Sequence, residues 1–95
     1  MYGRYMDTLG INYLNNNIDA SVILSNKNYF GIQFYNKSNE EVTLYLEIDL
    51  YELNINGKVK SITNLFDNSN VLFNNNKLTL KIGANSPLAL KVLYE

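Results

Sequence analysis

The chain has 95 residues, of which 46% are hydrophobic and 18% are charged, and its net charge is −1. These values suit one small globular domain, because a disordered chain of this length would carry more charge and fewer apolar residues. Scattered lysines and arginines form no basic stripe, so no nucleic-acid partner is expected. The sequence has no cysteine and no histidine, which excludes disulfides, a cysteine nucleophile and a Ser-His-acid triad.

The same composition predicts no membrane insertion. No apolar stretch reaches the roughly 20 residues that a spanning helix needs. Residues 1–7 lack the apolar centre of a signal peptide. These features do not determine the compartment, although the missing export signal favours the cytoplasm.

The first part of the chain differs from the rest. Residues 1–17 show no clean periodicity and are expected to be a linker, with room for a short lead-in strand at 11–14. Such a lead-in suggests a domain taken from a longer polypeptide. Residues 18–95 are expected to form the β-sandwich domain.

Alternation of apolar and polar residues predicts the first strands. Residues 18–24 and 29–35 alternate on either side of a short polar turn, and an unbroken alternation follows from 42 to 51. Such a pattern gives a strand one dry face and one wet face. The loop at 36–40 is short enough to join antiparallel neighbours, so strands 29–35 and 42–51 are expected to pair.

Turn residues divide the second half of the chain. Asn56-Gly57 predicts a reversal, because both residues tolerate positive φ. The strand expected at 59–66 changes phase at Ser61, as an inserted bulge residue would cause. Further strands, separated by asparagine-rich turns, are expected at 71–73, 77–82 and 88–94.

Short strands with turn signals between them predict an all-β fold of about seven to eight strands. We expect a two-sheet antiparallel β-sandwich of Greek-key, immunoglobulin-like type, in which each sheet gives its aliphatic face to the core. A closed barrel is the alternative. The alternation predicts these core residues: Ile18, Ala20, Val22, Leu24, Phe30, Ile32, Phe34, Val42, Leu44, Leu46, Ile48, Leu50, Leu78, Leu80, Ile82, Leu88, Leu90 and Val92.

Three polar patterns could indicate chemistry. Glu47 and Asp49 are expected about 7 Å apart on one strand face, as in the acid and base of an inverting glycosidase. A flat face does not provide the concave, partly dry setting that catalytic carboxylates need, so a solvated face is the preferred interpretation. Residues 67–70 lack the downstream glutamate of a calcium loop, and the glycosylation sequon at 36–38 is a common chance match. No catalytic residue, metal site or cofactor is predicted.

Four tyrosines form the candidate contact surface. Tyr29 and Tyr35 fall on the polar face of one predicted strand, and Tyr45 and Tyr51 on that of the next. If these strands pair, all four rings share one sheet surface, and their apolar bodies and polar tips suit an interface. Three interpretations stay open: the rings pack on one another, they contact another domain of the same polypeptide, or they form a platform for a glycan.

The order of strands and turns resembles a known type of domain. The residues that carry the likeness are Tyr29–Ser38 with Glu40-Glu41 and the strand from Val42, then Asn56–Val59, Asn64–Asp67, Lys77–Ile82 and the closing strand after Ser86-Pro87. Together they resemble the C-terminal β-sandwich of bacterial carbohydrate-active enzymes built on a TIM barrel, namely amylase-like and related glycoside hydrolases and sugar phosphorylases. The family pattern often has a glycine-containing turn where this chain has residues 67–70, which leaves the exact family open.

The resemblance implies a non-catalytic C-terminal accessory domain that packs on and stabilises the catalytic barrel and could assist glycan binding. It implies that the chain is not an enzyme by itself, because the catalytic residues of those enzymes lie in the barrel. The implied partners are the catalytic domain of the same polypeptide and a carbohydrate. The alternative is a free-standing immunoglobulin-like or carbohydrate-binding module that contacts a protein or glycan partner.

Overall fold

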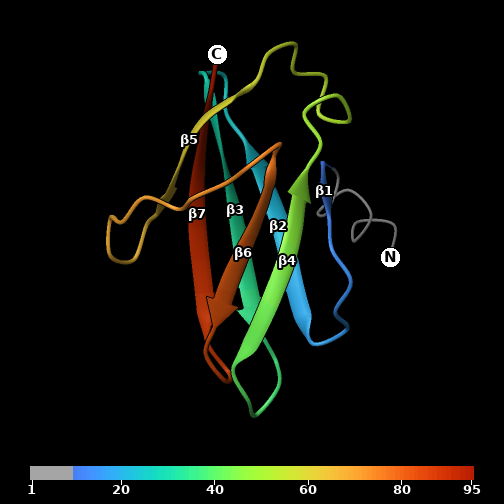
Figure 1. Cartoon of the computed structure of the whole chain (residues 1–95), viewed down its shortest axis with the longest axis vertical. Coiled ribbons are helices and arrows are strands. Elements are labelled where there is room, and N and C mark those ends of the chain that lie inside the picture. The colour runs from blue at the N-terminus through green and yellow to red at the C-terminus, as the bar shows by residue number, and fades with distance from the viewer. Residues whose placement is uncertain (1–9) are drawn as a thin grey trace.

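A computed structural model describes residues 10–95, and the predicted all-β sandwich is confirmed in that part of the chain. Residues 10–95 contain no helix that could cross a membrane. Two layers of strands face each other in Figure 1. The strands are β1 (Ile11–Asn12), β2 (Ile18–Leu24), β3 (Tyr29–Asn36), β4 (Val42–Ile48), β5 (Val59–Asn64), β6 (Lys77–Ile82) and β7 (Pro87–Tyr94).

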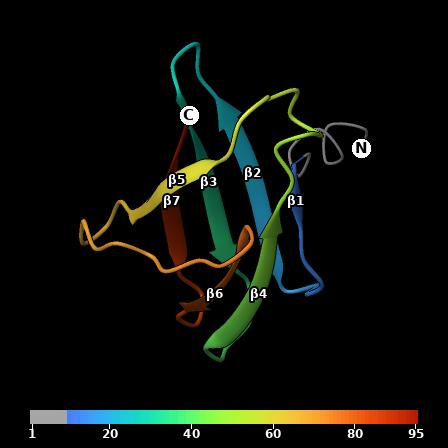
Figure 2. The ribbon, with the colours of Figure 1, turned by 45° about the horizontal axis from the view of Figure 1, so that its top comes forward.

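The strands form two antiparallel sheets. Sheet A has three strands in the order β1-β4-β6, and sheet B has four in the order β2-β3-β7-β5. Figures 1 and 2 show β4 and β6 crossing in front of sheet B. Among the described strands, only β2 and β3 are consecutive and share a sheet. Every other connection therefore carries the chain from one layer to the other.

The expected pairing of strands 29–35 and 42–51 is wrong. β3 pairs with β2 and β7 in sheet B, whereas β4 pairs with β1 and β6 in sheet A. The polar loop after β3 therefore crosses between the layers instead of closing a hairpin. A loop of this length is compatible with either path, so its length did not decide the pairing.

A buried asparagine holds this crossing in place. The Asn36 side chain is fully buried, and its amide donates to the carbonyls of Glu40, Ile82 and Gly83 at 2.8, 3.0 and 3.0 Å. Its carbonyl accepts from the Ser38 backbone N–H at 2.9 Å. These bonds tie the end of β3 in sheet B to the end of β6 in sheet A. Since the amide is buried and occupied, the sequon pattern does not mark an accessible glycan acceptor in the folded chain.

The expected reversal at Asn56-Gly57 also differs from the structure. The chain passes there from sheet A to sheet B, and the positive φ lies at Asn54 (59°). Glycine at 57 has a different role, because a Cβ atom there would clash with the main-chain carbonyl of Glu95. Lys58 and Glu95 exchange two backbone hydrogen bonds of 3.0 Å, which hold the two segments together.

The segment from β5 to β6 is partly as expected. The predicted bulge is confirmed by a register shift between Val59 and Ser61. The strand expected at 71–73 is wrong, because only isolated bridges join Thr63 to Asn70 and Asn74 to Lys77 on either side of it. Val71 and Phe73 pack partly against the core, whereas Leu72 is exposed.

The core lies between the two sheets and follows the predicted alternation at most positions. Val22 and Val42 are only partly buried, and Leu24, the last residue of β2, is 58% exposed. The alternation also missed buried positions outside the regular runs: Ile11, Leu53, Val59 and Ile62.

The predicted linker at 1–17 extends beyond the described residues, because residues 1–9 lie outside them. Within it, Ile11–Asn12 forms β1 and pairs with β4, inside the range where a short lead-in strand was expected. The Ile11 side chain is buried in the core. The described end of this segment therefore contributes to the sandwich.

Candidate functional site

The four candidate tyrosines do not share one surface. Tyr29 and Tyr35 lie on β3 in sheet B, Tyr45 lies on β4 in sheet A, and Tyr51 lies in the turn after β4. On both strands the tyrosines alternate with buried residues, so their rings point out on opposite sides of the sandwich. The expected single surface is therefore wrong, because it depended on pairing β3 with β4. A role for each ring in binding stays a prediction.

The two tyrosines of sheet B contact other groups of the domain. The Tyr35 hydroxyl donates to the Asn85 carbonyl at 3.2 Å, and the ring is 42% exposed. The Lys91 Nζ atom lies 4.5 Å from the centre of the Tyr29 ring. A cation over an aromatic face is worth about 0.5–1 kcal/mol at an exposed site. Both tyrosines of β3 thus have partners within the domain, on β7 and in the β6–β7 turn.

The outer face of sheet B has two small residues near its centre and exposed apolar residues at its margins. Gly31 of β3 and Ala89 of β7 are small residues on this face, and a Cβ atom at Gly31 would meet only a backbone oxygen at 3.7 Å. Ile23 on the β2 side is half-exposed, and Leu65 and Phe66 after β5 are also exposed. The cross-strand neighbours of Gly31 and Ala89 are Lys91 and Gln33, and the apolar margins offer area that another protein surface can bury.

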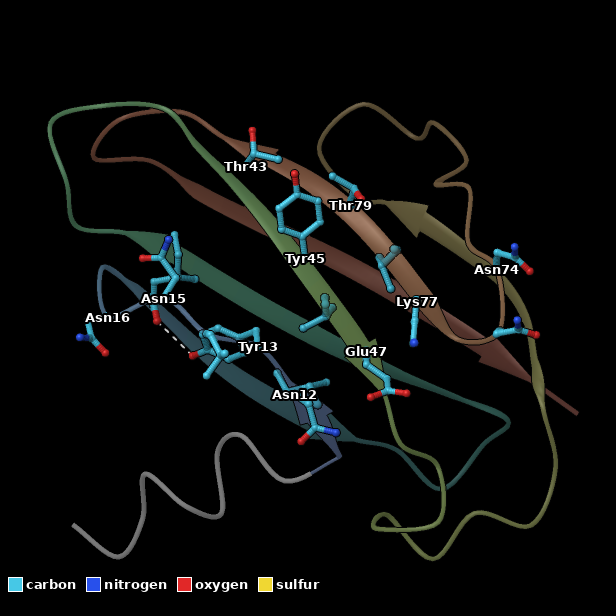
Figure 3. Close-up of a pocket in the computed structure, with 16 residues that line it drawn as sticks. Asn12, Tyr13, Asn15, Asn16, Thr43, Tyr45, Glu47, Asn74, Lys77 and Thr79 are labelled. Atoms are coloured by element: carbon cyan, nitrogen blue, oxygen red, sulfur yellow. Dashed lines mark hydrogen bonds between the residues drawn. The ribbon is translucent and has the colours of Figure 1, made fainter.

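Sheet A carries a groove of about 1360 Å³, between the segment that follows β1 and the turn that precedes β6. Tyr45 lies at its centre and is 72% exposed. Figure 3 shows its ring projecting from β4 between Thr43 and Thr79, with Glu47 and Lys77 further along the same strands. Tyr45 and Thr79 are directly opposite each other in the ladder, as are Glu47 and Lys77.

The groove mixes apolar and polar side chains and is almost free of net charge. Among the described residues, its only charged side chains are Glu47 and Lys77, which face each other across β4 and β6. The Tyr13 hydroxyl, at the β1 side, donates to the Ile18 carbonyl at 3.0 Å. The other polar side chains of the lining are hydroxyls and neutral amides: Thr43, Thr79, Asn12, Asn15, Asn16, Asn74 and Asn75.

Backbone groups of β4 also face this groove. The Asp49 N–H bonds to the Gly10 carbonyl at 2.7 Å, and the last residue pair between β1 and β4 is Asn12 with Glu47. The next hydrogen-bonded pair along the ladder, two residues further on, would be Leu14 with Tyr45. The chain departs before that pair forms, and the Leu14 side chain is 99% exposed. The Ile48 N–H bonds to the Asn76 carbonyl on the β6 side at 2.8 Å, so the alternate residue Tyr45 directs its N–H and C=O to the β1 side. On that side no strand residue of 10–95 pairs with Tyr45.

The carboxylates considered for catalysis do not act as a pair. β4 ends at Ile48, so Glu47 lies on the strand while Asp49 lies in the turn after it. The Asp49 carboxylate accepts from the Glu52 N–H at 3.3 Å, as a turn-closing residue does. No group of three or more His, Cys, Asp or Glu residues that could hold a metal occurs within residues 10–95.

The segment at 67–70 is an exposed turn. Asp67 Oδ1 accepts from the Ser69 N–H at 2.9 Å, and Asn68 has a positive φ of 60°. Hydrogen bonds from the side chain and then the backbone of Ser69 lower the pKa of the Asp67 carboxyl from its usual value. This is the behaviour of a carboxylate that closes a turn on the surface.

The groove was not apparent from the sequence. Asn15 and Asn16 were assigned to a linker, and Asn74 and Asn75 to a turn, although each pair borders the groove. The sequence shows the two asparagine runs, at 15–17 and 74–76, but both lie far from Tyr45 along the chain. Their proximity depends on β1 and β6 both pairing with β4, which alternation alone does not predict.

The chain matches no protein-family model and no curated protein at a significant level. Solved structures with a similar fold include a provisionally assigned α-N-acetylgalactosaminidase from Bacillus halodurans, with a TM-score of 0.67 and 16% identity over 92% of this chain and 20% of that protein. α-Galactosidase I from Mortierella vinacea gives a TM-score of 0.66 and 16% identity over 86% of this chain and 22% of that protein. A GH27 β-L-arabinopyranosidase from Geobacillus stearothermophilus gives a TM-score of 0.64 and 12% identity over 88% of this chain and 19% of that protein.

These likenesses concern the fold. At 12–16% identity, no residue role can be transferred from one chain to the other. This chain spans about a fifth of the length of each of the three proteins, from 19% to 22%.

Proposed function

We propose that this chain is a non-catalytic accessory domain of a glycoside hydrolase, and that it packs on and stabilises the catalytic domain of the same polypeptide. The observation that carries the proposal is the likeness to three glycosidases over only a fifth of their length, with TM-scores of 0.64 to 0.67. A C-terminal position in a bacterial glycoside hydrolase or sugar phosphorylase is the finer form of the proposal.

We further propose that the outer face of sheet B contacts the catalytic domain. Gly31 and Ala89 are small residues that add little height to this face. The exposed apolar side chains of Ile23, Leu65 and Phe66 offer area to bury. The outer face of sheet A carries the groove instead. A docked catalytic domain would stabilise this domain and be stabilised by it, because binding favours both folded states.

The coding region that surrounds this sequence tests the proposal. We expect a catalytic glycoside hydrolase domain in the same reading frame. A stop codon on both sides, with no such domain in the frame, would overturn the accessory role. A secretion signal or repeated β-modules in that frame would instead support the alternative of a free-standing carbohydrate-binding module.

Two matched substitutions in the full polypeptide test the docking face. Gly31→Glu places a carboxylate opposite Lys91 on sheet B, and Thr43→Glu places one opposite Lys81 on sheet A. Each new charge faces a lysine, so the isolated domain should keep its fold in both cases. We expect Gly31→Glu, and not Thr43→Glu, to lower the melting temperature of the catalytic domain. Equal effects of the two variants would contradict docking through sheet B.

A further inference from the structure

We propose that the groove on sheet A binds a short neutral oligosaccharide, with the Tyr45 ring as its stacking platform. This inference deepens the proposed function, since it gives the accessory domain a ligand. The groove lies on the side of the sandwich opposite the proposed docking face, so both contacts can form at once.

Tyr45 is suited to a sugar ring. It is 72% exposed, and no partner for its hydroxyl occurs among the described residues. One aromatic face can therefore meet the C–H groups of a pyranose, whose partial positive charge is attracted to the negative face of the ring. Thr43 and Thr79 stand on either side of Tyr45, with hydroxyls at the edge of the platform.

The polar groups around the platform match a ligand that both donates and accepts hydrogen bonds. Each sugar hydroxyl does both, and each asparagine amide offers two donors and one acceptor oxygen. Such amides line the two ends of the groove, as at Asn12 and Asn74. The Tyr45 N–H and C=O, which have no strand partner among residues 10–95, add a donor and an acceptor beside the ring.

The charge and size of the groove narrow the class of ligand. The opposed charges of Glu47 and Lys77 leave little net field, which favours a neutral ligand over an anionic one. A volume of about 1360 Å³ exceeds the roughly 300–1,000 Å³ of sites for drug-sized molecules, so there is room for several sugar units.

The unpaired part of β4 could instead take up an extended peptide, which would add a strand to sheet A. A peptide bound in this way depends on backbone hydrogen bonds and needs neither the amide side chains nor a free aromatic face. The side chains present in the groove therefore favour the sugar, and peptide binding is the rival outcome of the test.

The test is a titration of the 95-residue chain, followed by backbone amide NMR signals, with neutral oligosaccharides that end in α-linked galactose. We expect signals of Asn12, Thr43 and Tyr45 to shift. Tyr45→Ala should weaken binding about tenfold or more, equivalent to about 1.4 kcal/mol. The matched variant Tyr35→Ala, on the opposite sheet, should leave the affinity unchanged, and raising the salt concentration should not weaken it.

Several results would overturn the inference. These are no shift at millimolar sugar, shifts that survive Tyr45→Ala in a folded variant, or binding that falls with salt. Binding of an extended peptide that protects the Tyr45 amide from exchange, without binding of sugar, would also overturn it. The accessory role fails separately, because it depends on the reading frame: sugar binding with no catalytic domain in frame would leave the groove assignment intact.

Discussion

The two outer faces of the sandwich arise from the same alternating pattern, yet they present their tyrosines differently. In sheet B, β3 lies between two long strands, and its tyrosines contact Lys91 and Asn85. In sheet A, β1 is only two residues long, so most of β4 has a neighbour on one side only, and Tyr45 stays exposed. The exposure of an aromatic residue on a strand thus depends on the length of the neighbouring strands. A binding surface remains where a neighbour is missing.

The largest loss of stability is expected from removing the Asn36 hydrogen bonds, which join the two sheets. Asn36→Ala removes the amide that ties β3 to the end of β6 and leaves the Ile82 carbonyl buried without this donor. We expect the free energy of unfolding to fall by about 2–4 kcal/mol, measured by denaturant titration. Asn39→Ala, at an exposed position of the same loop, is the control and should cost less than about 0.5 kcal/mol. Similar losses in both variants would show that the loop, and not the buried amide, joins the sheets.

A pair of glycine substitutions compares the edge of sheet A with an inner strand of sheet B. Gly10, just before β1, has a φ of 90°, and a Cβ atom there would meet Leu53 Cδ2 at 2.6 Å. We expect Gly10→Ala to lower the free energy of unfolding by about 1–3 kcal/mol, because the backbone strain adds to the clash.

Gly31→Ala in sheet B is the matched control. Its added Cβ has ordinary van der Waals space, so a change between zero and a gain of about 1 kcal/mol is expected. Thermal unfolding of both variants measures the difference. A harmless Gly10→Ala would mean that the start of sheet A tolerates displacement.

A smaller effect tests the contacts of the sheet B tyrosines. Lys91→Ala removes the cation from the Tyr29 ring and should cost about 0.5–1 kcal/mol of stability. Lys81→Ala, on the outer face of sheet A, has no such ring contact in the described residues and should cost less. Equal losses, measured by denaturant titration, would remove this distinction between the faces.

The smallest effect concerns pH, at the margin of sheet B. The pKa of Asp67 is lowered by its hydrogen bonds to Ser69, so the folded state favours the ionised form. The resulting stabilisation is present above the ordinary pKa of 3.8 and is lost as the pH falls through the lowered value. Asp67→Asn should remove this part of the acid dependence, measured as melting temperature against pH. An unchanged acid profile would contradict the role of the carboxylate.

Much of the fold could be predicted from particular residues. The rows through Leu44, Leu46 and Ile48 in sheet A and through Phe30 and Ile32 in sheet B are buried as the alternation predicts, because a strand sorts alternate side chains to opposite faces. The bulge at Ser61 also follows from a local change of phase.

The candidate site was predicted less well. Tyr45 was named as a candidate together with Tyr29 and Tyr35, which lie on the other sheet. Asn36 was assigned to the connecting loop at 36–40, whereas it ends β3 and its side chain is buried. Both errors involve contacts between residues that are distant in sequence.

The sequence by itself determined which residues form strands and which side of each strand is apolar, because these properties depend on neighbours within a few positions. Only the tertiary structure decided which strands share a sheet, since several pairings would bury the same aliphatic rows equally well. That choice separated the tyrosines and brought two asparagine runs to either side of Tyr45. The groove therefore results from strand order, a long-range property that no local pattern encodes.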